Sequence, residues 1–127
     1  TVDGNMDYDI DLGVWSTTSA ATVTIKHRGA SELTVTNTGL LQRTDVADPD
    51  MAVTVDYTGS TISGDGVLTL NTANDAMSVG SLTESSAKKT TVINIGGKAI
   101  MADTNVETNG IENGGVYQIV HTVNCIQ

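Results

Sequence analysis

Apolar and polar residues alternate along the first fourteen positions. Every second residue from Val2 to Val14 is apolar apart from one glycine, and most residues between them are Asp or Asn. Successive side chains of a β-strand point to opposite faces, so this pattern predicts one long strand with an apolar face and a charged face. Such a strand can pair within its own domain or complete the sheet of another subunit. The predicted apolar face comprises Val2, Gly4, Met6, Tyr8, Ile10 and Leu12.

A second long alternating segment lies near the other end of the chain. Residues 116–126 follow a pair of glycines and have the same period of two, which predicts another strand. The residues on its apolar face are Tyr117, Ile119, His121, Val123 and Cys125.

Short alternating segments separated by turn residues fill the interval. We predict a Ser/Thr-rich turn at residues 15–20, and a hairpin that pairs Met51–Tyr57 with Val67–Asn71 through the glycines at 64–66. No segment of useful length has a helical period. About eight or nine strands, with a turn signal roughly every ten residues, indicate an all-β fold and an immunoglobulin-like β-sandwich. The other predicted strands are 22–27, 32–36, 77–82, 90–95 and 98–102.

The length favours one globular unit. With 127 residues, we expect a single sandwich domain over residues 15–127, preceded by an extension over residues 1–14. A chain that begins at Thr1 rather than Met is expected to be a processed, secreted product. No apolar run approaches the roughly eighteen residues of a membrane span, so we expect no membrane insertion.

Charge excludes several classes of partner. Fifteen acidic residues against six basic ones give a net charge of -9. Binding of nucleic acid or of an anionic membrane needs a basic surface, and Lys88 with Lys89 is the largest basic run. A single cysteine, Cys125, excludes an intrachain disulfide.

The sequence contains no convincing catalytic set. His27 and His121 lie on predicted apolar strand faces, and Cys125 stands about 13 Å along a strand from His121, too far for activation of a nucleophile. Zinc-ligand spacings are missing, and the loop acids Asp45, Asp48 and Asp50 make only a weak case for calcium. We therefore expect a protein that is not an enzyme and has no cofactor or metal.

The two ends of the chain together resemble those of chaperone–usher pilins, the fimbrial subunits, or of a related strand-exchanging filament subunit. The similarity rests on the alternating start, Val2-x-Gly4-x-Met6-x-Tyr8-x-Ile10, and on a glycine pair followed by Tyr117 and an alternating end. In that family the immunoglobulin-like fold lacks its last strand. The resemblance implies an incomplete sandwich whose groove receives the N-terminal strand of the next subunit.

The resemblance also implies roles for individual residues. Val2, Met6, Tyr8 and Ile10 would fill pockets of the groove, continued by Leu12, and Gly4 would sit where a side chain cannot fit. The C-terminal strand would line the groove through Tyr117, Ile119 and Val123.

The implied product is a head-to-tail homopolymer. It would be an extracellular pilus or fimbria on a cell surface, with a role in adhesion and with a periplasmic chaperone and an outer-membrane usher as assembly partners. Two alternatives remain open. One is a monomeric secreted sandwich that acts as an adhesin or carbohydrate-binding module, and the other is a phage or virus surface protein.

Overall fold

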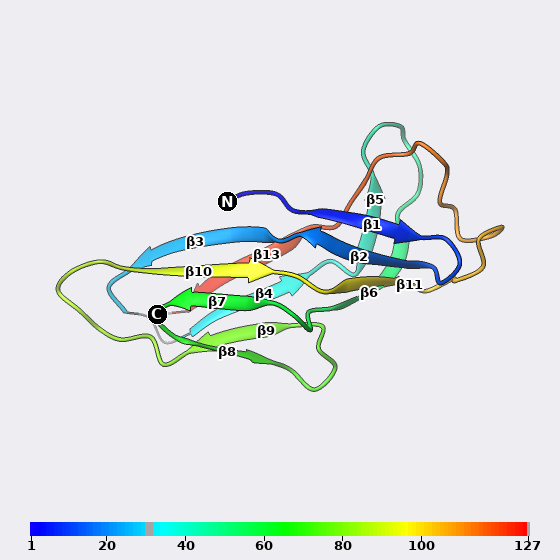
Figure 1. Ribbon diagram of the computed structural model, residues 1–127. Coiled ribbons are helices and arrows are strands. Elements are labelled where there is room, and N and C mark those ends of the chain that lie inside the picture. The colour runs from blue at the N-terminus through cyan, green and yellow to red at the C-terminus, as the bar shows by residue number, and fades with distance from the viewer. Residues whose placement is uncertain (30–31, 127) are drawn as a thin grey trace.

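The computed structural model describes residues 1–29 and 32–126, and this part of the chain is built from β-strands without a helix (Figure 1). It therefore contains no helix that could cross a membrane. The strands are β1 (Asn5–Asp9), β2 (Val14–Ser19), β3 (Ala21–His27), β4 (Glu32–Asn37), β5 (Leu40–Arg43), β6 (Met51–Asp56), β7 (Thr61–Gly64), β8 (Val67–Leu70), β9 (Met77–Gly80), β10 (Lys89–Ile95), β11 (Lys98–Met101), β12 (Tyr117–Gln118) and β13 (His121–Ile126).

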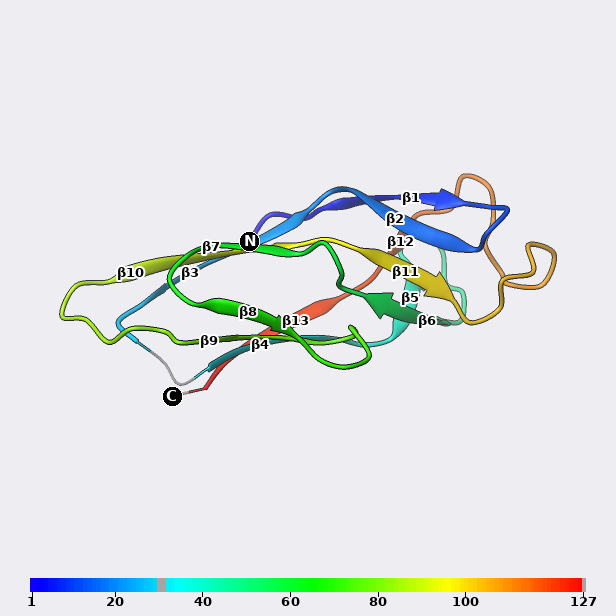
Figure 2. The ribbon, with the colours of Figure 1, turned by 60° about the horizontal axis from the view of Figure 1, so that its bottom comes forward.

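The strands form three antiparallel sheets, with orders β1-β2-β11-β6-β5-β12, β3-β10-β7 and β13-β4-β9-β8. The chain passes directly between the first two sheets at two places. Strand β2 continues into β3 through Ala20, and β10 continues into β11 through Gly96 and Gly97. Figure 2 shows the three-stranded and four-stranded sheets as two layers, as in a β-sandwich.

The core lies between these layers. Inward-facing residues alternate along the facing strands, with Leu33 and Val35 on β4 opposite Ile93 and Ile95 on β10. Tyr57, which follows β6, is also fully buried. The burial of these side chains supplies most of the stabilisation, at about 25 cal/mol per Å² of apolar surface.

The six-stranded sheet curls at its end of the molecule. Three strands separate β2 from β12 in the sheet order, yet the rings of Trp15 and Tyr117 lie 5.7 Å apart between centroids. Trp15 also contacts Tyr8 of the opposite edge strand, at 4.8 Å. The curl therefore brings the edge strands β1 and β12 towards each other around an aromatic cluster.

The two layers are connected differently on their two sides. On one side, the short turn at Asp65 and Gly66 carries the chain from β7 of one layer to β8 of the other. On the other side, β3 and β13 are edge strands of different sheets and do not pair. The sandwich is thus open along the side where β1, β12 and β13 lie.

The predicted long N-terminal strand is wrong. The chain turns at residues 10–13, so β1 ends at Asp9 and folds back against β2. Asp9 fixes this turn, because its carboxylate accepts hydrogen bonds from the amides of Asp11 (3.0 Å) and Leu12 (3.2 Å). Gly13 then adopts a φ of 67°, which glycine tolerates best.

Three further strand predictions are corrected. The expected turn at 15–20 is strand β2, because its Thr and Ser residues suit a half-buried pleated surface. The hairpin of Met51–Tyr57 with Val67–Asn71 does not form: β6 pairs with β5 and β11, and β8 pairs with β9. The predicted C-terminal strand is divided into β12 and β13, since it pairs first with β5 and then with β4.

The remaining strand predictions are confirmed in outline. Residues 32–36, 77–82, 90–95 and 98–102 correspond to β4, β9, β10 and β11, and 22–27 lies within β3. The sequence also predicts a turn over residues 28–31 around Gly29, and residues 30 and 31 of it lie outside the described part of the chain.

Candidate functional site

A groove of about 590 Å³ runs along the open side of the sandwich. One wall is the N-terminal segment, residues 1–6, and the other is the C-terminal segment, residues 117–121. Core residues form its floor, among them Leu41, Val55 and Ala99. The groove thus gives access to apolar surface between two stretches of chain that are more than a hundred residues apart.

The C-terminal wall presents an unpaired strand edge. The carbonyls of Val116 and Val120 accept hydrogen bonds from the amides of Thr44 (2.8 Å) and Thr38 (3.4 Å), on the side of β4 and β5. Neighbouring residues of a strand direct their backbone groups to opposite edges. The odd-numbered residues of 117–121 therefore direct their N–H and C=O groups away from β4 and β5, towards the open edge.

A half-buried chain of hydrogen bonds anchors this wall to the core. The Tyr57 hydroxyl lies 2.7 Å from Nδ1 of His121 and accepts a hydrogen bond from the Asn37 side-chain amide at 3.2 Å. A neutral His121 ring whose proton lies on Nε2 accepts a hydrogen bond from the Tyr57 hydroxyl at Nδ1. Burial lowers the pKa of His121 and raises that of Tyr57, which favours these neutral forms.

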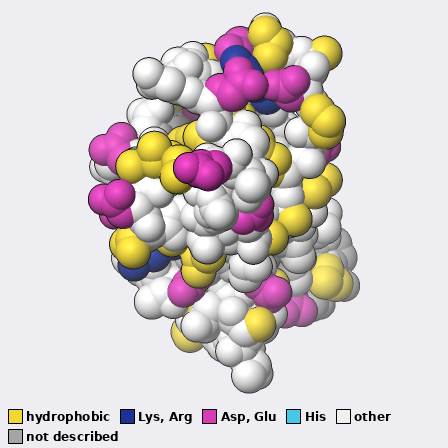
Figure 3. Space-filling view, turned by 90° about the vertical axis from the view of Figure 1, so that its right-hand side faces the viewer, with side chains coloured by type: hydrophobic (Ala, Val, Ile, Leu, Met, Phe, Trp, Pro, Cys, Tyr) yellow, Lys and Arg dark blue, Asp and Glu magenta, His cyan; other side chains and the backbone are white. Residues whose placement is uncertain are grey.

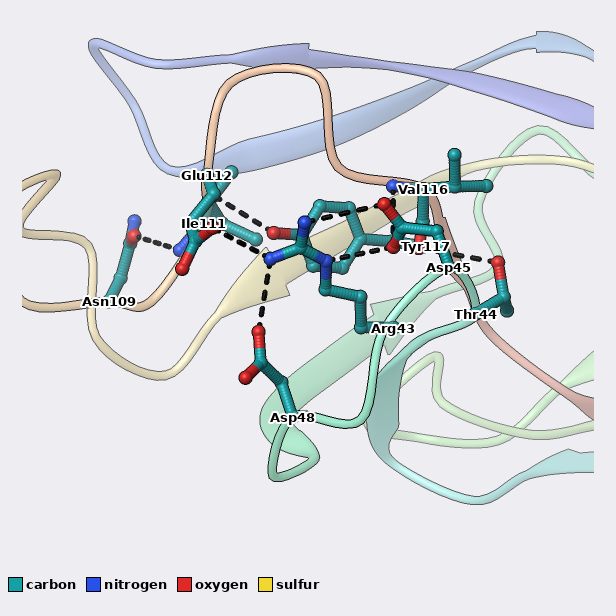
Figure 4. Close-up of polar contacts among 9 residues, drawn as sticks. All are labelled: Arg43, Thr44, Asp45, Asp48, Asn109, Ile111, Glu112, Val116 and Tyr117. Carbon is teal, nitrogen blue, oxygen red and sulfur yellow. Dashed lines mark hydrogen bonds and ion pairs between the residues drawn. The ribbon is translucent and has the colours of Figure 1, made fainter.

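Ion pairs of Arg43 stabilise the beginning of the C-terminal wall, near Tyr117 (Figure 4). The guanidinium of Arg43, on β5, forms ion pairs with Asp45 (2.8 Å), Asp48 (3.0 Å) and Glu112 (2.8 Å). It also lies 5.8 Å from the centre of the Tyr117 ring. One side chain therefore connects the loop after β5 with the long loop that leads into β12.

These ion pairs engage two of the three acids that suggested calcium, Asp45 and Asp48. The hydrogen bond from Arg43 lowers the pKa of Asp45 to about 2 and keeps its carboxylate charged. Asp45 also accepts a hydrogen bond from the amide of Val116, at 3.3 Å. Among the described residues, no group of three or more His, Cys, Asp or Glu side chains is arranged to hold a metal ion.

The N-terminal wall is attached to the domain at few points. Before β1 begins, Val2 and Thr22 exchange two backbone hydrogen bonds of 2.9 Å each. Gly4 packs directly on the bend between β2 and β3, where an added Cβ would overlap the Ser19 carbonyl oxygen and the Ala21 nitrogen. The resemblance placed Gly4 against a neighbouring subunit, whereas here the tight contact is with the same chain.

The predicted donor residues divide into two groups. Met6 and Tyr8 pack against the core from β1, paired in cis with β2. The other three apolar residues remain largely exposed: Val2 is 65%, Ile10 57% and Leu12 62% exposed.

Two of the three predicted groove residues line the groove. Tyr117 and Ile119 are on its wall, whereas Val123 lies beyond it on β13 and packs against the core. His121, which lies on a predicted apolar strand face, also lines the groove.

Trp15 is the groove residue that sequence reasoning missed. It lies on β2, in a segment interpreted as a turn, and lines the groove between Tyr8 and Tyr117. Its Nε1 is buried and has no hydrogen-bond partner among the described residues. The β-branched residues Val14, Thr17 and Thr18 could have indicated a strand there, with Trp15 and Thr17 on one face.

The other histidine has a structural role. His27 is buried at the end of β3, and its Nε2 lies 2.8 Å from the Thr91 hydroxyl. Thr91 donates its only proton to the carbonyl of Asp65 at 2.8 Å, so Nε2 of His27 is the donor. Cys125 is exposed near the end of β13.

Comparison with known proteins gives no assignment for this arrangement. No protein-family model matches the chain, no curated protein is similar to it in sequence, and no solved structure matches its fold.

Proposed function

We propose that this protein is a structural subunit of an extracellular filament, in which a β-strand of one subunit enters the groove of the next. The observation that carries the proposal is the open groove between two chain ends, with a floor of core side chains and an unpaired edge along β12 and β13. In this view the fold is an immunoglobulin-like sandwich that lacks one strand. By the resemblance to pilins, a chaperone and an usher would protect that groove before assembly.

An inserted strand would satisfy groups that the single chain leaves open. Its backbone would pair with the free edge of the C-terminal wall, as in other cases of strand addition. Its carbonyls are acceptors of the kind that the buried Nε1 of Trp15 lacks. Long unpaired edges otherwise promote nonspecific association, so a specific occupant has a clear physical advantage.

The N-terminal strand is the proposed donor. In cis it leaves Val2, Ile10 and Leu12 exposed. Burial of each in a neighbouring groove would contribute about 1.5–3 kcal/mol. Transfer would also break the cis pairing of β1 with β2, so the exchange needs the new contacts to outweigh those that are lost. Donation from head to tail does not close on itself and therefore produces a filament.

A reversible cis lock tests the donor assignment. Asp7 and Ser16 are register partners across β1 and β2. The double substitution Asp7→Cys/Ser16→Cys should therefore allow a disulfide between the two strands. Cys125→Ser is added so that no other cysteine is present. We expect the oxidised protein to give a single band on an unheated SDS gel. After reduction it should form a ladder of multimers that collapses on boiling.

A second lock away from the groove serves as the control. Thr69 and Ser78 are register partners across β8 and β9, and oxidation of Thr69→Cys/Ser78→Cys should leave the ladder unchanged. A ladder that persists in the oxidised cis lock would exclude the N-terminal strand as donor. No multimers under any condition, oxidised or reduced, would overturn the filament itself.

A monomeric binding module is the second candidate. The observations that favour it are the cis pairing of β1 and the aromatic rings of Trp15 and Tyr117 along the groove, because aromatic faces are frequent in binding sites. If the reduced protein stays monomeric, the fluorescence of Trp15, the single tryptophan, can be followed while soluble oligosaccharides are added. A saturable change would support this function.

A further inference from the structure

Charge is distributed unevenly between the two ends of the molecule. The acidic end, as we call it, comprises the turn at residues 9–13 and the segments 43–50 and 102–116, which lie together on the right in Figures 1 and 2. Eight of the fifteen acidic residues belong to it, and Arg43, enclosed by its ion pairs, is its one base. Its acids are Asp9, Asp11, Asp45, Asp48, Asp50, Asp103, Glu107 and Glu112.

Apolar side chains are interspersed among these acids. Figure 3 shows this end with acidic and apolar groups exposed side by side and few basic ones. Five large apolar residues contribute, each more than 40% exposed. An exposed surface of this composition is typical of an interaction site rather than of a purely solvated face. These residues are Ile10, Leu12, Val46, Val106 and Val116.

The basic residues collect at the opposite end. Lys26 and Arg28 lie at the end of β3 and Lys88 and Lys89 at the start of β10, and these strands pair with Thr90 opposite Lys26. None of the four forms an ion pair with another described residue. They make up four of the six lysines and arginines of the chain, and we call this surface the basic end.

Three acids share the basic end, so it is close to neutral overall. Glu32 and Glu84 are two of them, and the carboxylate of the third, Asp65, accepts hydrogen bonds from the amide and hydroxyl of Thr83. The contrast between the ends is nevertheless large. At physiological salt, charges interact over about 8 Å, so the charges of the surfaces in contact decide how two copies meet.

We infer that the partner of the acidic end is the basic end of a second copy. Parallel copies side by side would bring two acidic ends together, whereas copies stacked end to end place the basic end, with its four bases and three acids, against the acidic end and cover the exposed apolar side chains. This contact is heterologous and extends without closing. It rests on the proposed function, to which it adds the polarity and the docking surfaces of the filament.

The test uses the oxidised cis lock, in which strand exchange is blocked. We expect sedimentation velocity at about 20 mM NaCl to show association that increases with protein concentration. At about 500 mM NaCl, where the screening length falls from about 20 Å to about 4 Å, this association should be lost. A protein that stays monomeric at low salt at all concentrations would overturn the inference.

Charge reversals then identify the surfaces. Lys88→Glu should lower the association constant about tenfold, equivalent to about 1.4 kcal/mol. Lys98→Glu makes the same change in net charge on β11, beside the groove and outside both ends, and should have little effect on the contact between the ends. Equal effects of the two substitutions would show that only net charge matters and would contradict end-to-end docking.

Charge reversals at both ends together should restore the association that each weakens alone. Arg28→Glu/Lys88→Glu at the basic end and Asp11→Lys/Glu107→Lys at the acidic end should each weaken association, and a chain that carries both sets should recover it. Failure of this rescue would count against the inference alone. The proposed function fails separately, if the reduced wild-type protein gives no heat-sensitive ladder on SDS gels.

Discussion

At the scale of single residues, Gly4 is the position where space is most restricted. A Cβ there would overlap backbone atoms of Ser19 and Ala21, so the N-terminal segment must move away from the bend to accept one. We expect Gly4→Ala to lower the free energy of unfolding by about 1–3 kcal/mol, as for other overpacked sites. Amide hydrogen exchange at Thr22, whose N–H bonds to the carbonyl of Val2, should become faster.

Gly80 offers the matched control. It lies on β9, and an added Cβ would meet no atom within 4 Å. Gly80→Ala should therefore leave the free energy of unfolding, measured by urea titration for both variants, nearly unchanged. If Gly4→Ala is as harmless as Gly80→Ala, the N-terminal segment does not rest on the β2–β3 bend in solution.

His121 makes stability depend on pH. Burial lowers its folded-state pKa below its usual value of 6.5, so the unfolded chain binds the proton more readily. This contribution is fully present above about pH 6.5. It is lost as the pH falls from there towards the folded pKa, with a slope of at most about 1.4 kcal/mol per pH unit. In the tautomer whose proton lies on Nε2, protonation of Nδ1 also removes the acceptor of the Tyr57 hydroxyl.

A substitution isolates this effect from the titration of carboxylates. We expect urea unfolding of the wild type to lose stability between pH 7.5 and 5.5, and His121→Gln to lose clearly less over the same interval. Parallel curves for the two proteins would assign the pH dependence to other groups.

At the scale of elements, the Arg43 cluster holds the C-terminal wall of the groove. Its side chain is 9% exposed and forms ion pairs with three carboxylates from two loops. Arg43→Met keeps most of the apolar stem but leaves these carboxylates to repel one another. We expect limited proteolysis within residues 102–116 to become several-fold faster, because that loop loses its attachment through Glu112.

Lys98→Met removes a basic residue that forms no ion pair with another described residue and is the control for this experiment. Its cleavage rate should match that of the wild type. An Arg43→Met protein that is cut no faster would mean that the backbone pairing of β12 with β5 is sufficient to hold the wall.

The elements also show how far the sequence could predict the fold. Alternation identified β4, β6 and β10 because one face of each is buried, and a period of two then follows directly. The same alternation continues in the sequence through residues 10–13, but in the structure the chain turns there. The hydrogen bonds of the Asp9 carboxylate and the positive φ of Gly13 form this turn, and the alternating pattern does not reveal them. Strand partners such as β6 with β11 depend on contacts between distant segments, which the pattern along the chain does not contain.

The walls of the groove were predictable from the alternating pattern, whereas its floor was not. Both walls of the groove belong to segments that alternation marked, including Tyr117 and Ile119. The floor and the position of Trp15 depend on the curl of the six-stranded sheet, which is a tertiary property.

At the scale of the whole molecule, the N-terminal strand should be separable from the rest. Deletion of residues 1–12 removes β1, uncovers the edge of β2 and exposes the core contacts of Met6 and Tyr8. We expect the shortened chain to unfold at lower temperature and to recover on addition of a synthetic peptide of residues 1–12. Trp15, which touches Tyr8, reports the binding through its fluorescence.

A scrambled peptide of the same composition provides the control and should not restore stability. A deletion variant that is as stable as the full chain and indifferent to the peptide would show that this strand contributes nothing to the domain and is not a donor.

The distance along the chain between the two walls of the groove has a consequence for folding. Closing a contact between residues 1–6 and 117–121 requires almost the whole chain to be ordered first, and long-range pairings slow folding. During synthesis, β4 emerges long before its neighbour β13, so its backbone edge stays open meanwhile. The interval before β13 arrives is therefore when a newly made chain is most exposed to aggregation, and a helper that binds this edge would act most effectively then.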